Sequence, residues 1–286
     1  MDGGRVDKTW VHNGPSLGCQ DNNGLPAPDH PLRLIRAAVH PGWRSAYFGV
    51  MTLRVGVAYP DPPFNAMPGQ SGLDIEVMTA LADAIGERAE FVAYDGADFD
   101  GIFERLAAGD FDCVIAGTTV TPDREEKAAF LPPYLISGQG LAVDTSRLPN
   151  VHSIDDLAGL TIGVQRGNTS EPIAQRLVED GKAGRVRVYD YGAVNAAVAD
   201  LVSGGCDALM KLAPVLRELV KEVPGVEVVQ QHLSVENIAI AVNAADQSLL
   251  ARLQVAQAEL EDDGTLQRIR RRWLGNPYVD QSSGML

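Results

Sequence analysis

The sequence predicts an α/β protein built from two successive units of similar design, and two pairs of repeated segments support this prediction. The strand-like runs 53–57 (LRVGV) and 160–164 (LTIGV) are each followed by a polar loop. In 106–116 (LAAGDFDCVIA) and 201–210 (LVSGGCDALM), a helix end, a glycine and an aspartate lead into an apolar strand. Further helices and strands alternate within each unit, which is typical of parallel βαβ sheets.

Apolar residues at helical spacing predict the helices of these units. One predicted helix ends at Gly86, and a second, over 249–260, ends before Gly264. Thr265 is expected to cap a last helix that runs through Trp273. The basic run 268–272 then lies on the solvent face of that helix.

Composition excludes several classes of function. The chain has 286 residues and a net charge of −14, so it would repel a phosphate backbone, and we expect no nucleic-acid partner. Its three cysteines, Cys19, Cys113 and Cys206, have no CxxC spacing, which indicates neither a disulfide framework nor a zinc site. The signatures GxSxG, HExxH, Walker A and GxGxxG are absent from the sequence. We therefore expect no metal and no cofactor.

The first 50 residues form a segment of a different kind. They are rich in Gly, Pro, Asn and Asp, and no apolar run follows a basic start as it would in a signal peptide. We interpret 1–50 as a disordered or misassigned leader, with Met51 directly before the first strand, and 276–286 as a C-terminal tail. The sequence has no apolar run long enough to span a bilayer. As encoded, the chain is expected to stay in the cytoplasm.

Several segments, in this order and spacing, resemble the type II extracytoplasmic solute-binding proteins of polar amino-acid ABC importers, known as family 3. They are LRVGVAYPDPPF, GLDIEVMTALADAIG, FDGIFERLAAGDFDCVIAGTTVTPDREEKAAFLPPYLISGQGLAV, SIDDLAGLTIGVQRGNTSE, GGCDALM and AELEDDGTLQRIRRRWLG. The resemblance implies a two-lobed fold hinged by two crossing strands, near 140–143 and 237–242. Lobe one would comprise 51–143 plus 237–275, and lobe two 144–236. It also implies a monomer that binds an amino acid or another carboxylate, with an ABC transporter permease as partner and a periplasmic or extracellular location.

Arg124 is the first candidate site residue. Thr121 is a good N-cap and Pro122 suits a first helical position, so a helix is predicted to begin here. The positive charge of Arg124 in the first turn is unfavourable, because this end of a helix is itself positive. Residues that depart from local preferences in this way concentrate at functional sites. The resemblance implies that Arg124 binds the ligand's carboxylate through its planar fork, helped by Gly117 and Thr119. The alternative is an exposed arginine paired with a nearby carboxylate.

In lobe two, residues 166–172 (RGNTSEP) follow a strand and open a helix, so the amides near Asn168 and Thr169 could bind an anion. Ordinary helix capping would explain the same residues. The resemblance implies that the positions of Asn168, Thr169 and Ser170 meet the ligand.

The chain departs from the family at the acid that pairs with the ligand's α-ammonium. The family has an aspartate a few residues after the position of Asp207, and this chain has Leu212 there. Asp61 could supply the charge from lobe one, and Glu171 and Glu236 are the next acids to test if it does not. Lys211 could favour a second anionic group, or it could simply be solvated.

Aromatic residues complete the predicted site. Tyr59 and Phe99 are expected to pack against the ligand, whereas Phe64 is interpreted mainly as structural. An alternative function is an enzyme similar to cyclohexadienyl dehydratase, which shares the fold and acts on carboxylic acids. Glu171 or Glu236 would then serve as the acid, but no spacing distinguishes either. Binding is the preferred interpretation.

Overall fold

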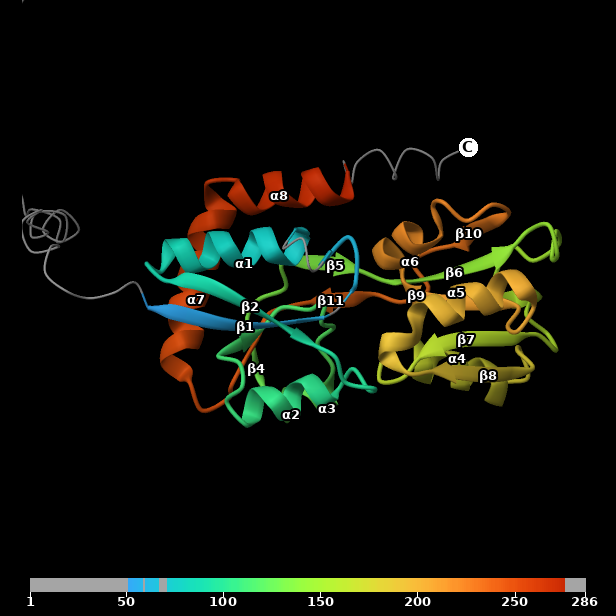
Figure 1. Ribbon diagram of the computed structural model, residues 1–286, viewed down its shortest axis with the longest axis horizontal. Helices are drawn as coiled ribbons and strands as arrows, with labels where there is room; N and C mark the ends of the chain where they lie inside the picture. Colours follow the sequence, from blue (N-terminus) through green and yellow to red (C-terminus); the bar gives the residue numbers. More distant parts are fainter. Residues whose placement is uncertain (1–50, 59, 67–70, 276–286) are drawn as a thin grey trace, which may run out of the picture. The chain divides into compact units, whose positions relative to one another are not determined.

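The computed structural model describes residues 51–58, 60–66 and 71–275. The predicted leader 1–50, the tail 276–286 and Tyr59 lie outside these residues, so the expectations for them remain predictions. Two five-stranded sheets, each with its own helices, and a two-stranded pair between them make up the described part of the chain (Figure 1).

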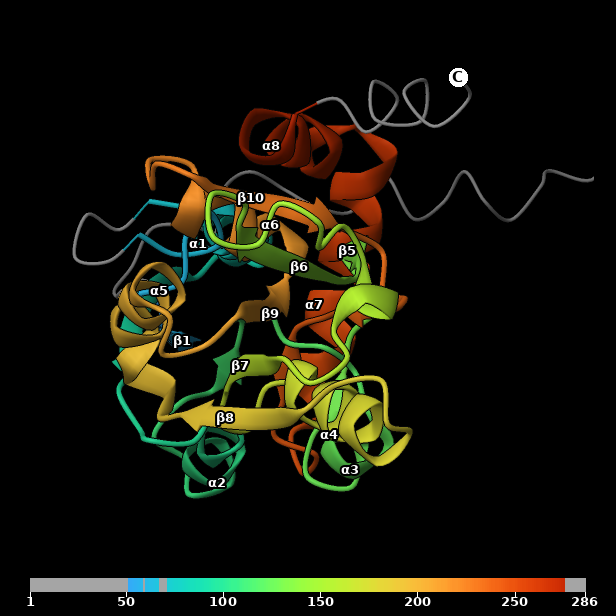
Figure 2. The ribbon, with the colours of Figure 1, turned by 90° about the vertical axis from the view of Figure 1, so that its right-hand side faces the viewer.

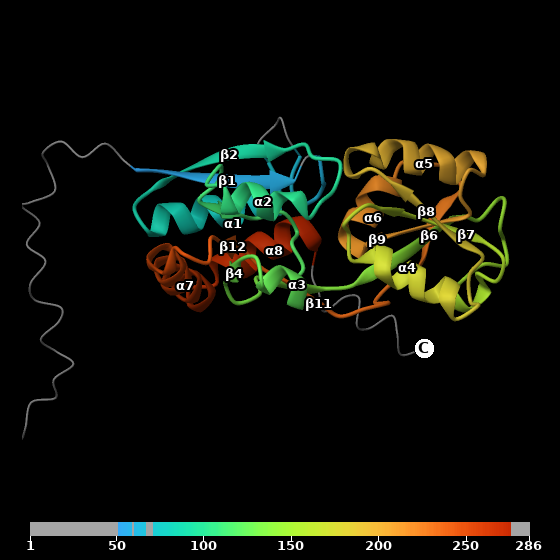
Figure 3. The same ribbon diagram turned by 90° about the horizontal axis from the view of Figure 1, so that it is seen from below.

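The first sheet has the strand order β2-β1-β3-β12-β4. β1 pairs in parallel with β2 and β3, and β12, which comes from late in the chain, is antiparallel to β3 and β4. Helices α1, α7 and α8 pack on one another, as Figures 1 and 3 show, and share a core with β1, whereas α2 belongs to a second core. The bounds are β1 (Thr52–Ala58), α1 (Leu73–Ala84), β2 (Arg88–Tyr94), α2 (Gly101–Ala107), β3 (Cys113–Val114), α3 (Pro122–Glu125), β4 (Ala129–Phe130), β12 (Ala241–Val242), α7 (Gln247–Asp262) and α8 (Thr265–Leu274).

The second sheet has the order β10-β6-β9-β7-β8, with β7 parallel to β8 and β9, and β6 antiparallel to β9 and β10. Successive strand residues point to opposite faces, so Met210 joins the core that includes residues of α4, and Leu209 the core that includes residues of α5 and α6. Helices α4 and α5 lie on opposite sides of this sheet (Figure 2). The bounds are β6 (Gln139–Asp144), β7 (Thr161–Gln165), α4 (Ser170–Glu179), β8 (Arg185–Tyr189), α5 (Val194–Ser203), β9 (Ala208–Leu212), α6 (Ala213–Val220) and β10 (Val226–Gln230), with short 3-10 turns η2 (Ile154–Asp156) and η3 (Tyr191–Ala193).

The predicted repeat is confirmed. The segments β1-α1-β2-α2-β3 and β7-α4-β8-α5-β9 follow the same course, and each places its first strand between the other two. The runs 53–57 and 160–164 lie in different sheets, as a fold of two separate units requires.

The crossing between the sheets differs in detail from the expectation. Residues 140–143 lie inside β6, where they pair with β9 and β10 of the second sheet. The two segments that connect the sheets are β5 (Leu135–Ser137) and β11 (Glu236–Ile238), which pair antiparallel with each other. The crossing therefore comes before 140–143, because the partners of this apolar run are strands of the second unit. The lobe boundaries stay a prediction.

One predicted helix cap is wrong. The N-cap of α8 is Gly264, in a left-handed conformation with φ 75°, and Thr265 is already helical. Asp263 accepts the Thr265 amide at 2.8 Å, and the Thr265 hydroxyl accepts from Arg268 at 2.7 Å. The aspartate two residues earlier thus takes the capping role that the threonine was expected to have.

Candidate functional site

Eight of the residues predicted from sequence line a single small cavity at the place where the two sheets and the crossing strands meet. Its volume is about 30 Å³, close to the space of one water molecule, so an amino acid enters only if these side chains move apart. The lining residues are Asp61, Phe99, Ala116, Gly117, Thr119, Arg124, Gln139, Asn168, Thr169, Lys211, Leu212 and Glu236.

Arg124 is held in this cavity by groups from both lobes. Thr121 caps α3 by accepting the Arg124 amide at 3.3 Å, which fixes the start of the helix as predicted. Arg124 as a whole is 4% exposed. It donates to the Thr119 carbonyl at 2.9 Å, to Asp100 at 2.9 Å, and to the Gly167 carbonyl at 3.0 Å. Arg124 is thus a buried cation rather than an exposed one.

Two aromatic rings flank the same guanidinium. Its central carbon lies 4.9 Å from the centroid of Phe99 and 5.6 Å from that of Phe103, distances at which a cation and a ring attract each other. Phe99 also meets Tyr191 edge-on at 5.3 Å. Phe64, fully buried in the core of lobe one, does not line the cavity, in agreement with its structural interpretation.

Lys211 and Asp61 form a buried ion pair in the cavity wall. The Lys211 ammonium lies 3.2 Å from Asp61 and donates to Gln165 at 2.5 Å, and the lysine is only 3% exposed. Burial raises the pKa of the Asp61 carboxyl, and the neighbouring Lys211 opposes that rise. The solvated alternative for Lys211 is therefore wrong, because the charge of Asp61 stabilises the buried lysine.

Glu236 lies at the start of the crossing strand β11 and is 4% exposed. Its carboxylate accepts four hydrogen bonds, from Thr119 (2.5 Å), Gln139 (2.8 Å), Ser234 (2.8 Å) and Thr169 (2.9 Å). Thr119 belongs to lobe one and Thr169 to the start of α4 in lobe two. A single carboxylate on the crossing strand therefore joins both lobes.

Asp74 holds the backbone of the lobe-one wall in place. It accepts the Gly117 amide at 2.8 Å and the Tyr134 hydroxyl at 2.5 Å. Burial raises the pKa of the Asp74 carboxyl to about 7, against the lowering effect of these two donors. Since Asp74 occupies the Gly117 amide, that N–H is already bonded within the protein.

The start of α4 forms the lobe-two wall. The Thr169 side chain does not cap the helix but donates to Glu236, so ordinary capping does not explain this threonine. Asn168 lines the cavity and bonds Gln165 at 3.4 Å. Ser170 is fully buried behind the lining, and its hydroxyl has no hydrogen-bond partner among the described residues. Glu171 accepts the Gly167 amide at 3.0 Å and does not line the cavity.

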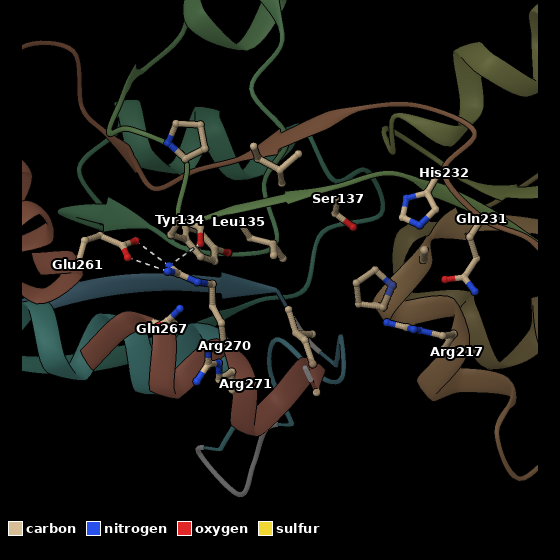
Figure 4. A pocket seen from close by; sticks show the side chains of 16 residues that line it. Tyr134, Leu135, Ser137, Arg217, Gln231, His232, Glu261, Gln267, Arg270 and Arg271 are labelled. Carbon is tan, nitrogen blue, oxygen red and sulfur yellow. Dashed lines mark hydrogen bonds and ion pairs between the residues drawn. The ribbon is translucent and has the colours of Figure 1, made fainter. Parts of the chain in front are cut away.

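A larger hollow of about 590 Å³ lies between β5 and α8 on one side and α6 on the other, and Figure 4 shows its side chains. Arg270 in its wall binds Glu261 through two bonds of 2.6 and 2.7 Å and donates to the Tyr134 carbonyl. None of the predicted site residues lines this hollow. We therefore assign the candidate site to the small cavity, where charged side chains from both lobes converge.

Comparison with known proteins identifies the family. Residues 53–276 match the model of the bacterial extracellular solute-binding proteins, family 3. The chain belongs to this family. ABC transporter arginine-binding protein 1 of Escherichia coli (strain K12) is 26% identical to it, over 84% of this chain and 98% of that protein.

Two solved structures of binding proteins are also similar to this family 3 chain. An ancestral arginine-binding protein bound to arginine is 34% identical, with a TM-score of 0.71 over 78% of this chain and 98% of the other. The ancestral amino acid-binding protein AncCDT-1, described as a precursor of cyclohexadienyl dehydratase, is 32% identical, with a TM-score of 0.68 over 78% and 94%. These relatives are named as binding proteins, which supports binding over the dehydratase alternative.

Sequence reasoning missed two residues of the site and undervalued a third. Gln139 and Ala116 line the cavity but were not predicted, and Glu236 was considered only as the acid of an enzyme or as a second choice, after Asp61, for the ligand's ammonium. Glu236 begins the crossing strand β11 and Gln139 follows the crossing strand β5, and a polar residue at such a point is the signal that could have found them. Among the described residues, no group of His, Cys, Asp and Glu could hold a metal ion, and no helix is long and apolar enough to cross a membrane.

Proposed function

We propose that this solute-binding protein takes an amino acid, by its carboxylate, into the cavity between its lobes, and supplies it to an ABC transporter or signals its presence. The observation that supports the proposal is the buried guanidinium of Arg124, which contacts both lobes and lines the cavity. An arginine fork binds a carboxylate through two parallel charged hydrogen bonds. A transport role places the chain outside the cytoplasmic membrane as a monomer, with a permease as its partner.

The carboxylate would replace protein groups that now accept from Arg124. Asp100 is the group most easily replaced, because its side chain is 40% exposed while that of Arg124 is 5% exposed. When the lobes part, the bond to the Gly167 carbonyl is lost, and one edge of the guanidinium becomes available to a ligand. Reclosure around that ligand would then restore contacts from lobe two.

A thermal-shift screen of the twenty standard L-amino acids, L-cystine and simple carboxylates tests this function. A compound present at 100 times its dissociation constant adds about 2.7 kcal/mol to the free energy of unfolding. We expect at least one amino acid to stabilise the protein in this way. Stabilisation by none of them would contradict the proposal, and turnover of prephenate or arogenate would instead favour the dehydratase alternative.

Two further measurements address the location and the oligomeric state of the protein. Peptide mapping of the native N-terminus would show whether the chain is processed for export. Processing would contradict the expectation from sequence that the chain stays in the cytoplasm. Size-exclusion chromatography with light scattering tests the monomer.

A further inference from the structure

The cavity contains two acids and two bases, and only one of the acids has a basic partner. Lys211 pairs with Asp61 at 3.2 Å, and Arg124 pairs with Asp100 at 2.9 Å. Since Lys211 already compensates the charge of Asp61, that carboxylate is a poor choice for binding a second cation. The expected replacement of the family's aspartate by Asp61 is therefore not favoured by the arrangement of charges.

Glu236 is the acid that has no basic partner. Within the described part of the chain, all four hydrogen-bond donors to its carboxylate are neutral hydroxyl or amide groups, and no lysine or arginine forms an ion pair with it. A buried carboxylate without a cation is unfavourable, and a cationic ligand group would relieve that cost. Leu212, which stands where the family has its ammonium-binding aspartate, lines the same cavity.

A second, independent observation is the side-chain carbonyl of Gln139. This residue is 2% exposed and lines the cavity, and its amide nitrogen donates to both Glu236 and Thr169. Its oxygen has no hydrogen-bond partner among the described residues. An ammonium group has three donors and needs three acceptors. The Glu236 carboxylate, after the ligand replaces one of its four present donors, the Gln139 oxygen and a threonine hydroxyl oxygen would supply them.

The position of Glu236 also matches the geometry of an α-amino acid. Thr119 links the two charged sites, because its carbonyl accepts from Arg124 and its hydroxyl donates to Glu236. The carboxylate and the ammonium of an α-amino acid are bonded to the same α-carbon, so the sites that bind them must be close together. One residue that contacts both Arg124 and Glu236 meets this requirement.

We propose that Glu236, at the start of the crossing strand β11, accepts the ligand's α-ammonium group, with the Gln139 side-chain oxygen as a second acceptor. This inference rests on the proposed function. It assigns the selectivity for α-amino acids to the crossing strand rather than to strand β9, where Leu212 stands.

Calorimetric titration with matched pairs of compounds tests the inference. Each amino acid that stabilises the wild-type protein is compared with the same molecule lacking its α-amino group, beginning with L-arginine and 5-guanidinopentanoate. Glu236→Gln keeps the size of the side chain and removes its charge. We expect this variant to lower the affinity for the amino acid roughly 30-fold to several thousandfold, and the affinity for the deaminated compound far less. A purely structural role at the hinge would weaken both compounds alike.

Two variants serve as references in the same titrations. Glu218→Gln removes a carboxylate on α6 that pairs with Lys221 outside the cavity, and should change neither affinity. Asp61→Asn should leave the ratio of the two affinities unchanged. An unchanged ratio in Glu236→Gln, while the wild type binds amino acids, would overturn the inference and leave the proposed function standing. Binding of no amino acid by the wild type would overturn both.

Discussion

Replacing Arg124 with lysine keeps the positive charge in the cavity but removes the planar fork. The guanidinium reaches the Thr119 carbonyl, the Gly167 carbonyl and Asp100 in three directions, and it stacks against Phe99 and Phe103. A lysine ammonium is a point charge that cannot bind a carboxylate through two parallel bonds. Burying a ligand carboxylate against a group that cannot satisfy both of its oxygens costs about 2 to 5 kcal/mol of binding free energy. This cost lowers affinity roughly 30-fold to several thousandfold.

The lysine variant should also be less stable before any ligand is added. At least one of the two buried carbonyls that Arg124 binds would lose its donor, at a cost of about 1 to 3 kcal/mol in the free energy of unfolding. Binding must therefore be measured by calorimetry at a temperature where circular dichroism shows the variant to be folded. The compound to use is the amino acid that gives the largest thermal shift with the wild type.

Arg166→Lys is a matched control for this experiment. Arg166 lies next to Gly167, but its side chain is 46% exposed and pairs with Asp190 at 3.3 Å on the surface. The same substitution there should leave affinity within about threefold of the wild type, since exposed ion pairs contribute little. If Arg124→Lys also binds within threefold of the wild type, the carboxylate is not held by the fork of Arg124.

Three further predictions concern closure, the crossing and pH. Gly167→Ala should weaken amino-acid binding by roughly 5-fold to 150-fold in calorimetry, because the added Cβ would lie 2.2 Å from Asp98 and block the contact between lobes. Gly181→Ala, with a similar φ of 71° and no crowding, is the control; equal losses in both would contradict steric blocking. Gly138→Ala, directly after β5, should lower the free energy of urea unfolding by about 1 to 3 kcal/mol, because its Cβ would lie 2.1 Å from the Ser234 carbonyl just before β11, whereas Gly192→Ala meets nothing. For Asp74, the folded pKa of about 7 is above the ordinary 3.8, so its contribution to stability is complete below pH 3.8 and is lost as pH rises to about 7. The decline in unfolding free energy between pH 4 and 7 should be smaller in Asp74→Asn than in the wild type, and parallel curves would refute the assignment.

The elements of the fold were predictable from sequence because their signals are local. The alternation at 53–57, Thr121 with Pro122 before a helix, and Gly86 after one can each be recognised within a few residues, and the structure has them as expected. The crossing was misplaced because the run 140–143 predicts a strand without revealing its partners, which lie far along the chain.

The candidate site was predictable where the family resemblance supplied a role, as for Arg124 and Thr169. It was not predictable where a role depends on a distant neighbour. Lys211 reads as a solvated lysine until Asp61, 150 residues earlier, is placed 3.2 Å from it. Glu236 could be no more than a second choice, since three of its four donors, Thr119, Gln139 and Thr169, lie far from it along the chain.

The participation of the crossing segments in the cavity has a consequence for how affinity is set. Glu236 begins β11 and Gln139 follows β5, so the same side chains that line the cavity also influence how easily the lobes separate. The measured dissociation constant is the intrinsic one divided by the fraction of molecules competent to bind. A substitution at either residue changes both quantities together. Variants selected for a new ligand at these positions will therefore differ from the wild type in their resting distribution of open and closed forms, even when no ligand is present.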